Sequence, residues 1–138
     1  MANALYQLGV DLVLVVHCGG LDELAPIAVA TVATVTPDGV SMGTIDPFVL
    51  GFAKCTIADL KGGDRVENAA ILRQVMSGQL TGAVTDTVIL NAGAGLYVAG
   101  TAASVAEGCK LAADAIKKGT PMATLDKWVA ASNVAPVS

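Results

Sequence analysis

The sequence predicts an α/β fold that contains one buried strand, an antiparallel hairpin and several helices. Three observations predict it: a continuous run of leucine and β-branched residues, two β-branched runs joined by a short turn, and several segments with capping residues and helical apolar spacing. The 138 residues are 54% hydrophobic and only 14% charged. Such a chain is one domain at most, and it has enough apolar side chains to fill a core.

The first elements are a short helix and a strand that leads into an acidic loop. Residues 2–8 predict a helix that a glycine ends, and Leu12 to Val16 is a continuous apolar run typical of a strand buried on both faces. Two glycines after this strand let the backbone turn sharply toward Asp22 and Glu23. Because open α/β sheets bind ligands beyond the carboxyl ends of their strands, this acidic pair is a candidate site.

A hairpin is predicted next. Thr31 to Thr36 and Val40 to Ile45 are β-branched runs, and Pro37-Asp38-Gly39 joins them. Proline at the second position of a turn and glycine at the fourth favour a type I turn. We therefore expect two antiparallel strands.

Four helices are predicted in the second half of the chain. Asp64 with Glu67 forms a capping pattern that opens the first, and Asp86 is expected to cap the second, which stops at Gly100. The apolar residues expected to face the core from the first helix are Val66, Ala69, Leu72 and Met76. In the second helix, Gly93-Ala94-Gly95 lacks the spacing of a dinucleotide fingerprint and predicts close helix packing instead.

The last two helices carry similar signals. Ser104 with Glu107 is a capping box, and Thr120-Pro121 is a typical helix start. The first of the two has its apolar face at Val105, Cys109, Ala112 and Ile116. Trp128 on the last helix is expected in a core or an interface, without a chemical role.

Asp22 and Glu23 are the predicted metal ligands. Mg²⁺ takes oxygen ligands, keeps several waters, and is usually held by one or two carboxylates together with phosphate oxygens of a substrate. The alternative is that Asp22 caps a turn and Glu23 is a solvated charge. The residue pattern alone leaves both interpretations open.

Several segments, in the right order, resemble anthranilate phosphoribosyltransferases. In that family the acids of a Gly-Leu-Asp-Glu segment bind the Mg²⁺ that carries the substrate's diphosphate, and here the matching acids are Asp22 and Glu23. The end of the chain, Thr124 to Val129 with Ser132-Asn133, is most similar to the plant and algal branch. The other matching segments are His17 to Leu24 followed by Pro26, Gly51 to Ala53, Leu60 to Asp64, Glu67 to Leu72, Leu90 to Gly93 and Leu96 to Val98.

This resemblance implies both a fold and an activity. Residues 1–138 correspond to the C-terminal portion of a phosphoribosyltransferase/nucleoside phosphorylase-like α/β domain. The implied reaction is the Mg²⁺-dependent transfer of a phosphoribosyl group from phosphoribosyl diphosphate to anthranilate in tryptophan biosynthesis. The complete enzyme is a homodimer in the family.

Family features that precede this portion are absent from the sequence. They are the Gly-Thr-Gly-Gly-Asp loop that binds the diphosphate and the N-terminal helical domain used for dimerisation. We therefore expect a fragment, a mis-started gene model or half of a split protein, inactive alone. A second hypothesis is a non-catalytic module that docks on a partner chain, and a third is a relative of pyrimidine nucleoside phosphorylases. The residues of the loop from Ala25 to Ala30 also differ from those usual in the family. Whether this altered loop still supports metal binding is therefore left open.

Charge and hydropathy argue against a nucleic-acid-binding protein and against a membrane-spanning protein. A net charge of −4 and one adjacent basic pair, Lys117-Lys118, predict no binding to nucleic acid. No apolar run reaches the ~18 residues of a membrane-spanning helix. No targeting segment is visible. The compartment is left unassigned: the resemblance implies the plastid if the protein is from a plant or alga, and the cytoplasm otherwise.

The cysteines and the single histidine are assigned structural roles. Cys18, Cys55 and Cys109 are odd in number and lack a C-x-x-C spacing, which favours reduced, separately buried thiols. His17 ends the predicted strand beside the candidate site. A histidine there is expected to make a local hydrogen bond and not to act as a general acid or base.

Overall fold

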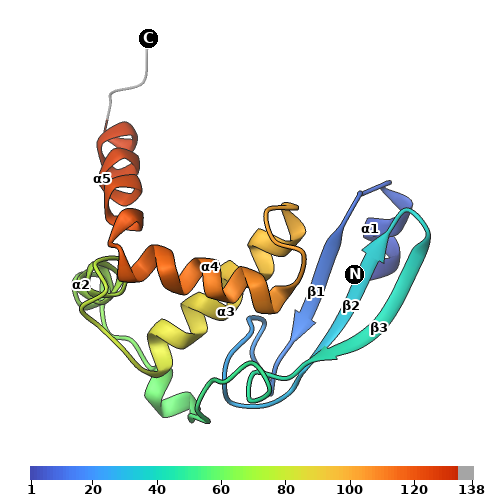
Figure 1. The fold of residues 1–138 in the computed structure, drawn as a ribbon, viewed down its shortest axis with the longest axis horizontal. Coiled ribbons are helices and arrows are strands. Elements are labelled where there is room, and N and C mark those ends of the chain that lie inside the picture. Colours follow the sequence, from blue (N-terminus) through green and yellow to red (C-terminus); the bar gives the residue numbers. More distant parts are fainter. Residues whose placement is uncertain (134–138) are drawn as a thin grey trace.

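The computed structural model describes residues 1–133, which form a three-stranded sheet with one short helix beside it at one end and the remaining helices at the other (Figure 1). The mixed α/β fold predicted from the sequence is confirmed. The elements are α1 (Ala2–Gln7), β1 (Val13–His17), β2 (Ala30–Thr36), β3 (Gly39–Ile45), the 3₁₀ helix η1 (Ile57–Leu60), α2 (Arg65–Met76), α3 (Ala83–Val98), α4 (Val105–Lys117) and α5 (Thr120–Ser132).

The sheet has the order β1-β2-β3, and both pairings are antiparallel. The predicted hairpin is confirmed, because Thr36 pairs with Gly39 and leaves Pro37-Asp38 as a two-residue connection. Gly39 has φ +138°, a backbone conformation that only glycine adopts without strain.

The prediction of a buried first strand is wrong. Residues 13–16 of β1 are half-buried and His17 is exposed, whereas the middle strand β2 buries Val32, Ala33 and Val35. The reason is position in the sheet: within residues 1–133, β1 has a neighbour on one side only, and β2 has neighbours on both. A β-branched apolar run indicates a strand that can be buried by neighbouring strands and helices. It does not indicate whether those neighbours are part of the same stretch of chain.

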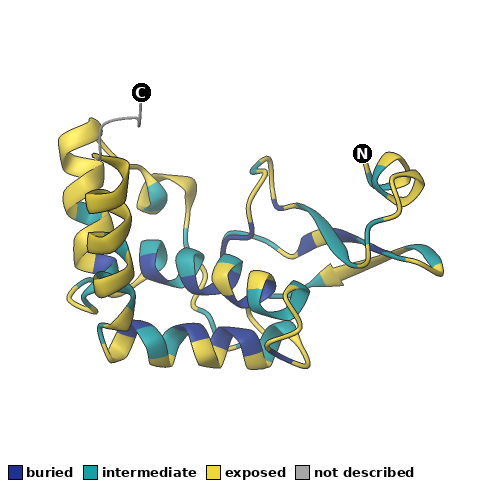
Figure 2. Ribbon diagram, turned by 90° about the horizontal axis from the view of Figure 1, so that it is seen from above, coloured by how far each residue is buried: buried dark blue, intermediate teal, exposed yellow. Residues whose placement is uncertain are grey.

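The core lies where α3 and α4 pack together and meet the loop that follows β1. Figure 2 shows most of the buried positions on α3, α4 and the sheet, whereas α2 and α5 are largely exposed. The core residues are Cys18, Leu24, Ala30, Val75, Ile89, Leu90, Ala94, Cys109, Ala112 and Ile116. The predicted inward face of α4 is therefore confirmed at Cys109, Ala112 and Ile116.

Helix α2 begins as predicted but turns a different face to the core. The Asp64 side chain accepts hydrogen bonds from the backbone N–H groups of Val66 and Glu67, and the Glu67 carboxylate accepts one from the Asp64 N–H. However, Val66 is 68% exposed, and the residue buried in the core is Val75. The residues that face the core, Ile71 and Val75, are four positions apart and also fit one face of a helix, so spacing alone does not choose between the two faces.

The ends of the later helices match the predictions except at Asp86. Helix α3 begins after Gly82, which has φ +94°, and Asp86 lies within its first turn without capping it. Ser104 caps α4 as predicted, and α5 begins at Thr120-Pro121. The Arg73 guanidinium on α2 donates to the Asp126 carboxylate on α5 at 3.0 Å. Among residues 1–133 there is no helix with the length and apolar character needed to span a membrane.

Candidate functional site

Asp22 and Glu23 lie in the loop between β1 and β2, immediately beyond the carboxyl end of β1. Both side chains are exposed. Within residues 1–133 the only salt bridge is between Arg73 and Asp126, and no side-chain hydrogen bond engages either acid of the pair. Asp22 therefore does not cap a turn in this part of the chain, and the carboxylate oxygens of both residues are free for a ligand.

A tight turn fixes the chain just before the acidic pair. The Cys18 N–H donates to the Leu21 carbonyl at 3.0 Å, and the Leu21 N–H donates back to the Cys18 carbonyl at 2.9 Å. The two residues between them, Gly19 and Gly20, have φ +55° and +93°. Positive φ at both central positions belongs to a type I′ turn, which explains why two glycines stand here. The backbone of Leu21 is thereby held beside the end of β1.

The Cys18 side chain packs beneath the rest of the loop. It is fully buried, and its Sγ lies 3.2 Å from the Ala25 carbonyl oxygen and 3.3 Å from that of Ala28. A thiol has one proton, so Cys18 donates to one of these two carbonyls at a time. Every non-glycine residue described has negative φ, so Cys18 is accommodated without backbone strain.

Asn91 on α3 fixes the chain just after the acidic pair. Its Oδ1 accepts a hydrogen bond from the Leu24 N–H at 3.0 Å, and its Nδ2 donates to the Leu24 carbonyl at 2.7 Å. The Leu24 side chain is only 2% exposed, so both its backbone and its side chain are anchored. The resemblance includes Asn91 in a matching segment but does not give it a role, and no local pattern shows that it meets a residue 67 positions away.

The thiols of Cys55 and Cys109 are not activated nucleophiles. Burial raises the pKa of Cys55, and the nearby charges of Asp59 and Asp86 raise it further. Burial also raises the pKa of the Cys109 thiol. Thiols with raised pKa values stay protonated and unreactive near neutral pH. The three cysteines are unpaired, as predicted, although Cys55 is only half-buried.

The donor set of the acidic pair suits a hard divalent cation. No group of three or more His, Cys, Asp or Glu side chains in the described residues is arranged to hold a metal, so a closed structural site is not present in residues 1–133. Two exposed carboxylates instead suit Mg²⁺, which keeps waters and takes phosphate oxygens from a substrate. His17 is exposed at the end of β1 and lies near this loop in the sequence. Its side chain makes no hydrogen bond within residues 1–133, so the expectation of a local hydrogen bond is wrong. The chemistry proposed for the acids does not require His17.

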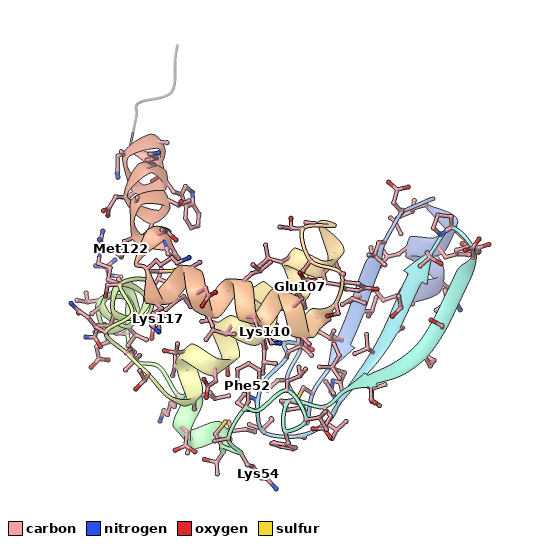
Figure 3. The ribbon with its side chains drawn as sticks, viewed as in Figure 1. Phe52, Lys54, Glu107, Lys110, Lys117 and Met122 are labelled. Atoms are coloured by element: carbon pink, nitrogen blue, oxygen red, sulfur yellow. The ribbon has the colours of Figure 1, made fainter. Side chains whose placement is uncertain are left out.

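A groove of about 490 Å³ lies between α3, α4 and the loop that follows β3. Phe52 of that loop and Lys110 of α4 both line it, and Figure 3 shows their side chains on the two sides. Asp86 of α3 lines it as well, and burial raises the pKa of this carboxyl group. The groove does not include Asp22 or Glu23, so it is separate from the acidic loop.

Comparisons with known proteins give one consistent result. A sequence model described as "Glycosyl transferase family, a/b domain" matches residues 1–122. The anthranilate phosphoribosyltransferase of Geobacter sulfurreducens is 42% identical over 134 residues, which cover 96% of this chain and 38% of that protein. That of Haloarcula marismortui is 42% identical over 131 residues, which cover 95% of this chain and 40% of that protein. The resemblance to anthranilate phosphoribosyltransferases stated from the sequence is confirmed, whereas the similarity of its last segment to the plant and algal branch stays a prediction.

Solved structures agree with the sequence matches. The crystal structure of anthranilate phosphoribosyltransferase from Thermus thermophilus is similar with a TM-score of 0.84 and 37% identity, covering 94% of this chain and 38% of that one. The Saccharomyces cerevisiae protein in complex with PRPP and Mg is similar in fold, with a TM-score of 0.72 and 24% identity, covering 80% of this chain and 32% of that one. This chain thus spans about two fifths of the length of the curated relatives it matches.

Proposed function

Because the chain belongs to the glycosyl transferase family, a/b domain, we propose that it is the C-terminal portion of the α/β domain of an anthranilate phosphoribosyltransferase. The complete protein would move a phosphoribosyl group from phosphoribosyl diphosphate to the amine of anthranilate. The bond from C1 of the ribose to the diphosphate oxygen breaks and the bond from C1 to nitrogen forms. Diphosphate leaves with the bonding electron pair, and the amine nitrogen loses one proton to solvent. The reaction belongs to tryptophan biosynthesis.

The observation that carries the proposal is the free pair of carboxylates at Asp22 and Glu23, held in a fixed loop beyond the end of β1. These residues would hold Mg²⁺ and leave its other positions open to water and to diphosphate oxygens. Bound there, Mg²⁺ would stabilise the negative charge that develops on the departing diphosphate. Asp22 and Glu23 themselves contribute the ligand oxygens and their placement, with no other described carboxylate needed.

In this proposal the remaining parts of the active site come from sequence outside these 138 residues. The diphosphate-binding loop and the anthranilate pocket belong to those parts, as does the surface that would pair two copies into a dimer. The chain alone would therefore bind metal weakly and would not turn over anthranilate.

One observation favours the alternative of a module that docks on a partner. Apolar side chains lie exposed on α2 and α5, including Val66 at 68%, Leu72 at 37% and Trp128 at 70% exposure. A docking module would need these side chains but not Asp22 or Glu23. The two functions therefore make opposite predictions for the acidic pair.

A transplant tests the proposal. The matching segment of the Thermus thermophilus protein would be replaced by this chain, and the loss of anthranilate fluorescence would be followed with phosphoribosyl diphosphate and Mg²⁺ present. We expect activity in the chimera and a loss on the order of 100-fold in Asp22→Asn/Glu23→Gln. The control is Asp38→Asn, an exposed acid in the β2–β3 turn. Equal activity in the double variant and its parent would contradict the proposal, and a folded but inactive chimera would favour the docking module.

A further inference from the structure

We propose that Asn91 is a positioning residue that sets the geometry of the Asp22–Glu23 loop. The inference rests on the proposed function, because it concerns how the same acidic pair is presented to a divalent cation. Asn91 contacts neither carboxylate. It acts through the backbone of Leu24, the residue that directly follows the pair.

The contact between Asn91 and Leu24 involves both backbone groups of Leu24. Asn91 Oδ1 accepts from the Leu24 N–H at 3.0 Å, and Nδ2 donates to the Leu24 carbonyl at 2.7 Å. Nδ2 also donates to the carbonyl of Thr87 in the same helix at 2.8 Å. A backbone N–H can only donate and a carbonyl can only accept, so these three bonds fix which way the amide points.

The position of Leu24 makes this contact specific for the acidic pair. Leu21 is fixed on one side of the pair by its two hydrogen bonds with Cys18, and Leu24 is fixed on the other side by Asn91. Only Asp22 and Glu23 lie between the two fixed points. A span of two residues with both ends held has few backbone conformations, so the backbone positions from which the two side chains extend are set before any ligand arrives.

Asparagine is the side chain that this arrangement requires. Aspartate could accept from the Leu24 N–H but could not donate to the Leu24 carbonyl, and it would place a charge beside two carbonyl oxygens. Leucine could do neither. The neighbouring residue Leu90 is fully buried in the core, so α3 provides a rigid base from which Asn91 reaches the loop.

The first test is amide hydrogen exchange of this chain, followed residue by residue by NMR. We expect Asn91→Ala to speed exchange of the Leu24 amide by about fivefold or more beyond its effect on amides in the core of α4, as expected for the loss of a structural hydrogen bond. Asn91→Asp should speed it less, because the acceptor for the Leu24 N–H remains. Thr85→Val is the matched control: the Thr85 hydroxyl on the same helix donates to the Leu80 carbonyl at 2.8 Å, in a different loop.

The second test measures the Mn²⁺ dissociation constant of the same variants, made in the Thermus thermophilus chimera that carries this chain, by electron paramagnetic resonance with phosphoribosyl diphosphate present. We expect weakening of about 10- to 100-fold in Asn91→Ala, as for other residues that orient metal ligands, and no change in Thr85→Val. Unchanged Leu24 exchange in Asn91→Ala, or equal losses of Mn²⁺ affinity in Asn91→Ala and Thr85→Val, would overturn the inference. Mn²⁺ binding that survives Asp22→Asn/Glu23→Gln would instead overturn the proposed function, while the exchange data would still decide the role of Asn91.

Discussion

Gly93 of α3 and Gly108 of α4 lie in backbone contact where the two helices cross. A Cβ atom on Gly108 would overlap the carbonyl oxygen of Gly93, and a Cβ on Gly93 would lie 2.5 Å from the backbone nitrogen of Cys109. Both glycines are buried. The distance between packed helices depends on the side chains at the contact, so this pair lets α3 and α4 approach closely. The expectation that Gly93-Ala94-Gly95 serves helix packing is thereby confirmed at Gly93.

A first prediction concerns two glycines in the same helix. Gly93→Ala should destabilise the chain by about 1–3 kcal/mol, because the new methyl group has no space and the helices must move apart. Gly95→Ala should stabilise it by roughly 0.5–1 kcal/mol, because a Cβ there meets no atom within 4 Å and alanine is the better helix former. Urea unfolding of both variants measures the difference. Equal effects would show that α3 and α4 do not meet at Gly93.

A second prediction concerns two threonines in α3. The Thr87 hydroxyl is buried and has no hydrogen-bond partner among residues 1–133. Thr87→Val should therefore leave the free energy of unfolding unchanged or raise it by up to about 1 kcal/mol, since it removes an unpaired buried polar group. Thr85→Val should lower it by about 1 kcal/mol, because the Leu80 carbonyl loses its donor. Destabilisation by Thr87→Val would show that its hydroxyl does have a partner.

A third prediction concerns the pH dependence of α2. The backbone N–H groups of Glu67 and Val66 donate to Asp64 and lower its pKa. Its charged form is therefore favoured in the folded state, so its stabilising effect is complete above the unfolded pKa of about 3.9 and is lost as pH falls through the lower folded pKa. Asp64→Asn keeps a good helix cap that does not titrate in this range. In thermal unfolding, the wild type should have a higher midpoint temperature than Asp64→Asn at about pH 6. This difference in midpoint temperature should disappear below about pH 3.9. A difference that is constant with pH would contradict this account.

The hairpin and the helix starts could be predicted because each depends on a few residues that are adjacent in the sequence. Pro37-Asp38-Gly39 determines the hairpin, and capping residues such as Asp64 and Ser104 mark helix starts. The exposure of β1 and the inward face of α2 could not be predicted, since both depend on which neighbours are present. The prediction that Asp86 caps α3 is wrong because the helix begins one turn earlier, after Gly82 with its positive φ.

In the candidate site, too, the local features could be predicted from the sequence and the tertiary contact could not. Asp22 and Glu23 stand out from the sequence as adjacent acids after an apolar strand. The turn closed by Cys18 and Leu21 follows from the two glycines between them. The role of Asn91 depends on a tertiary contact across 67 residues, and no periodicity or turn signal encodes such a contact.

The acidic loop is proposed to bind a divalent cation through Asp22 and Glu23 together with phosphoribosyl diphosphate. The most direct test is paramagnetic line broadening in NMR spectra of the isotope-labelled chain during titration with Mn²⁺ in the presence of phosphoribosyl diphosphate, with Asp38→Asn as the control for removal of an exposed charge. We predict that amide signals of residues 21–24 broaden first, in wild type and Asp38→Asn alike, and that Asp22→Asn/Glu23→Gln abolishes this effect. Broadening centred elsewhere, or unchanged in the double variant, would contradict the account.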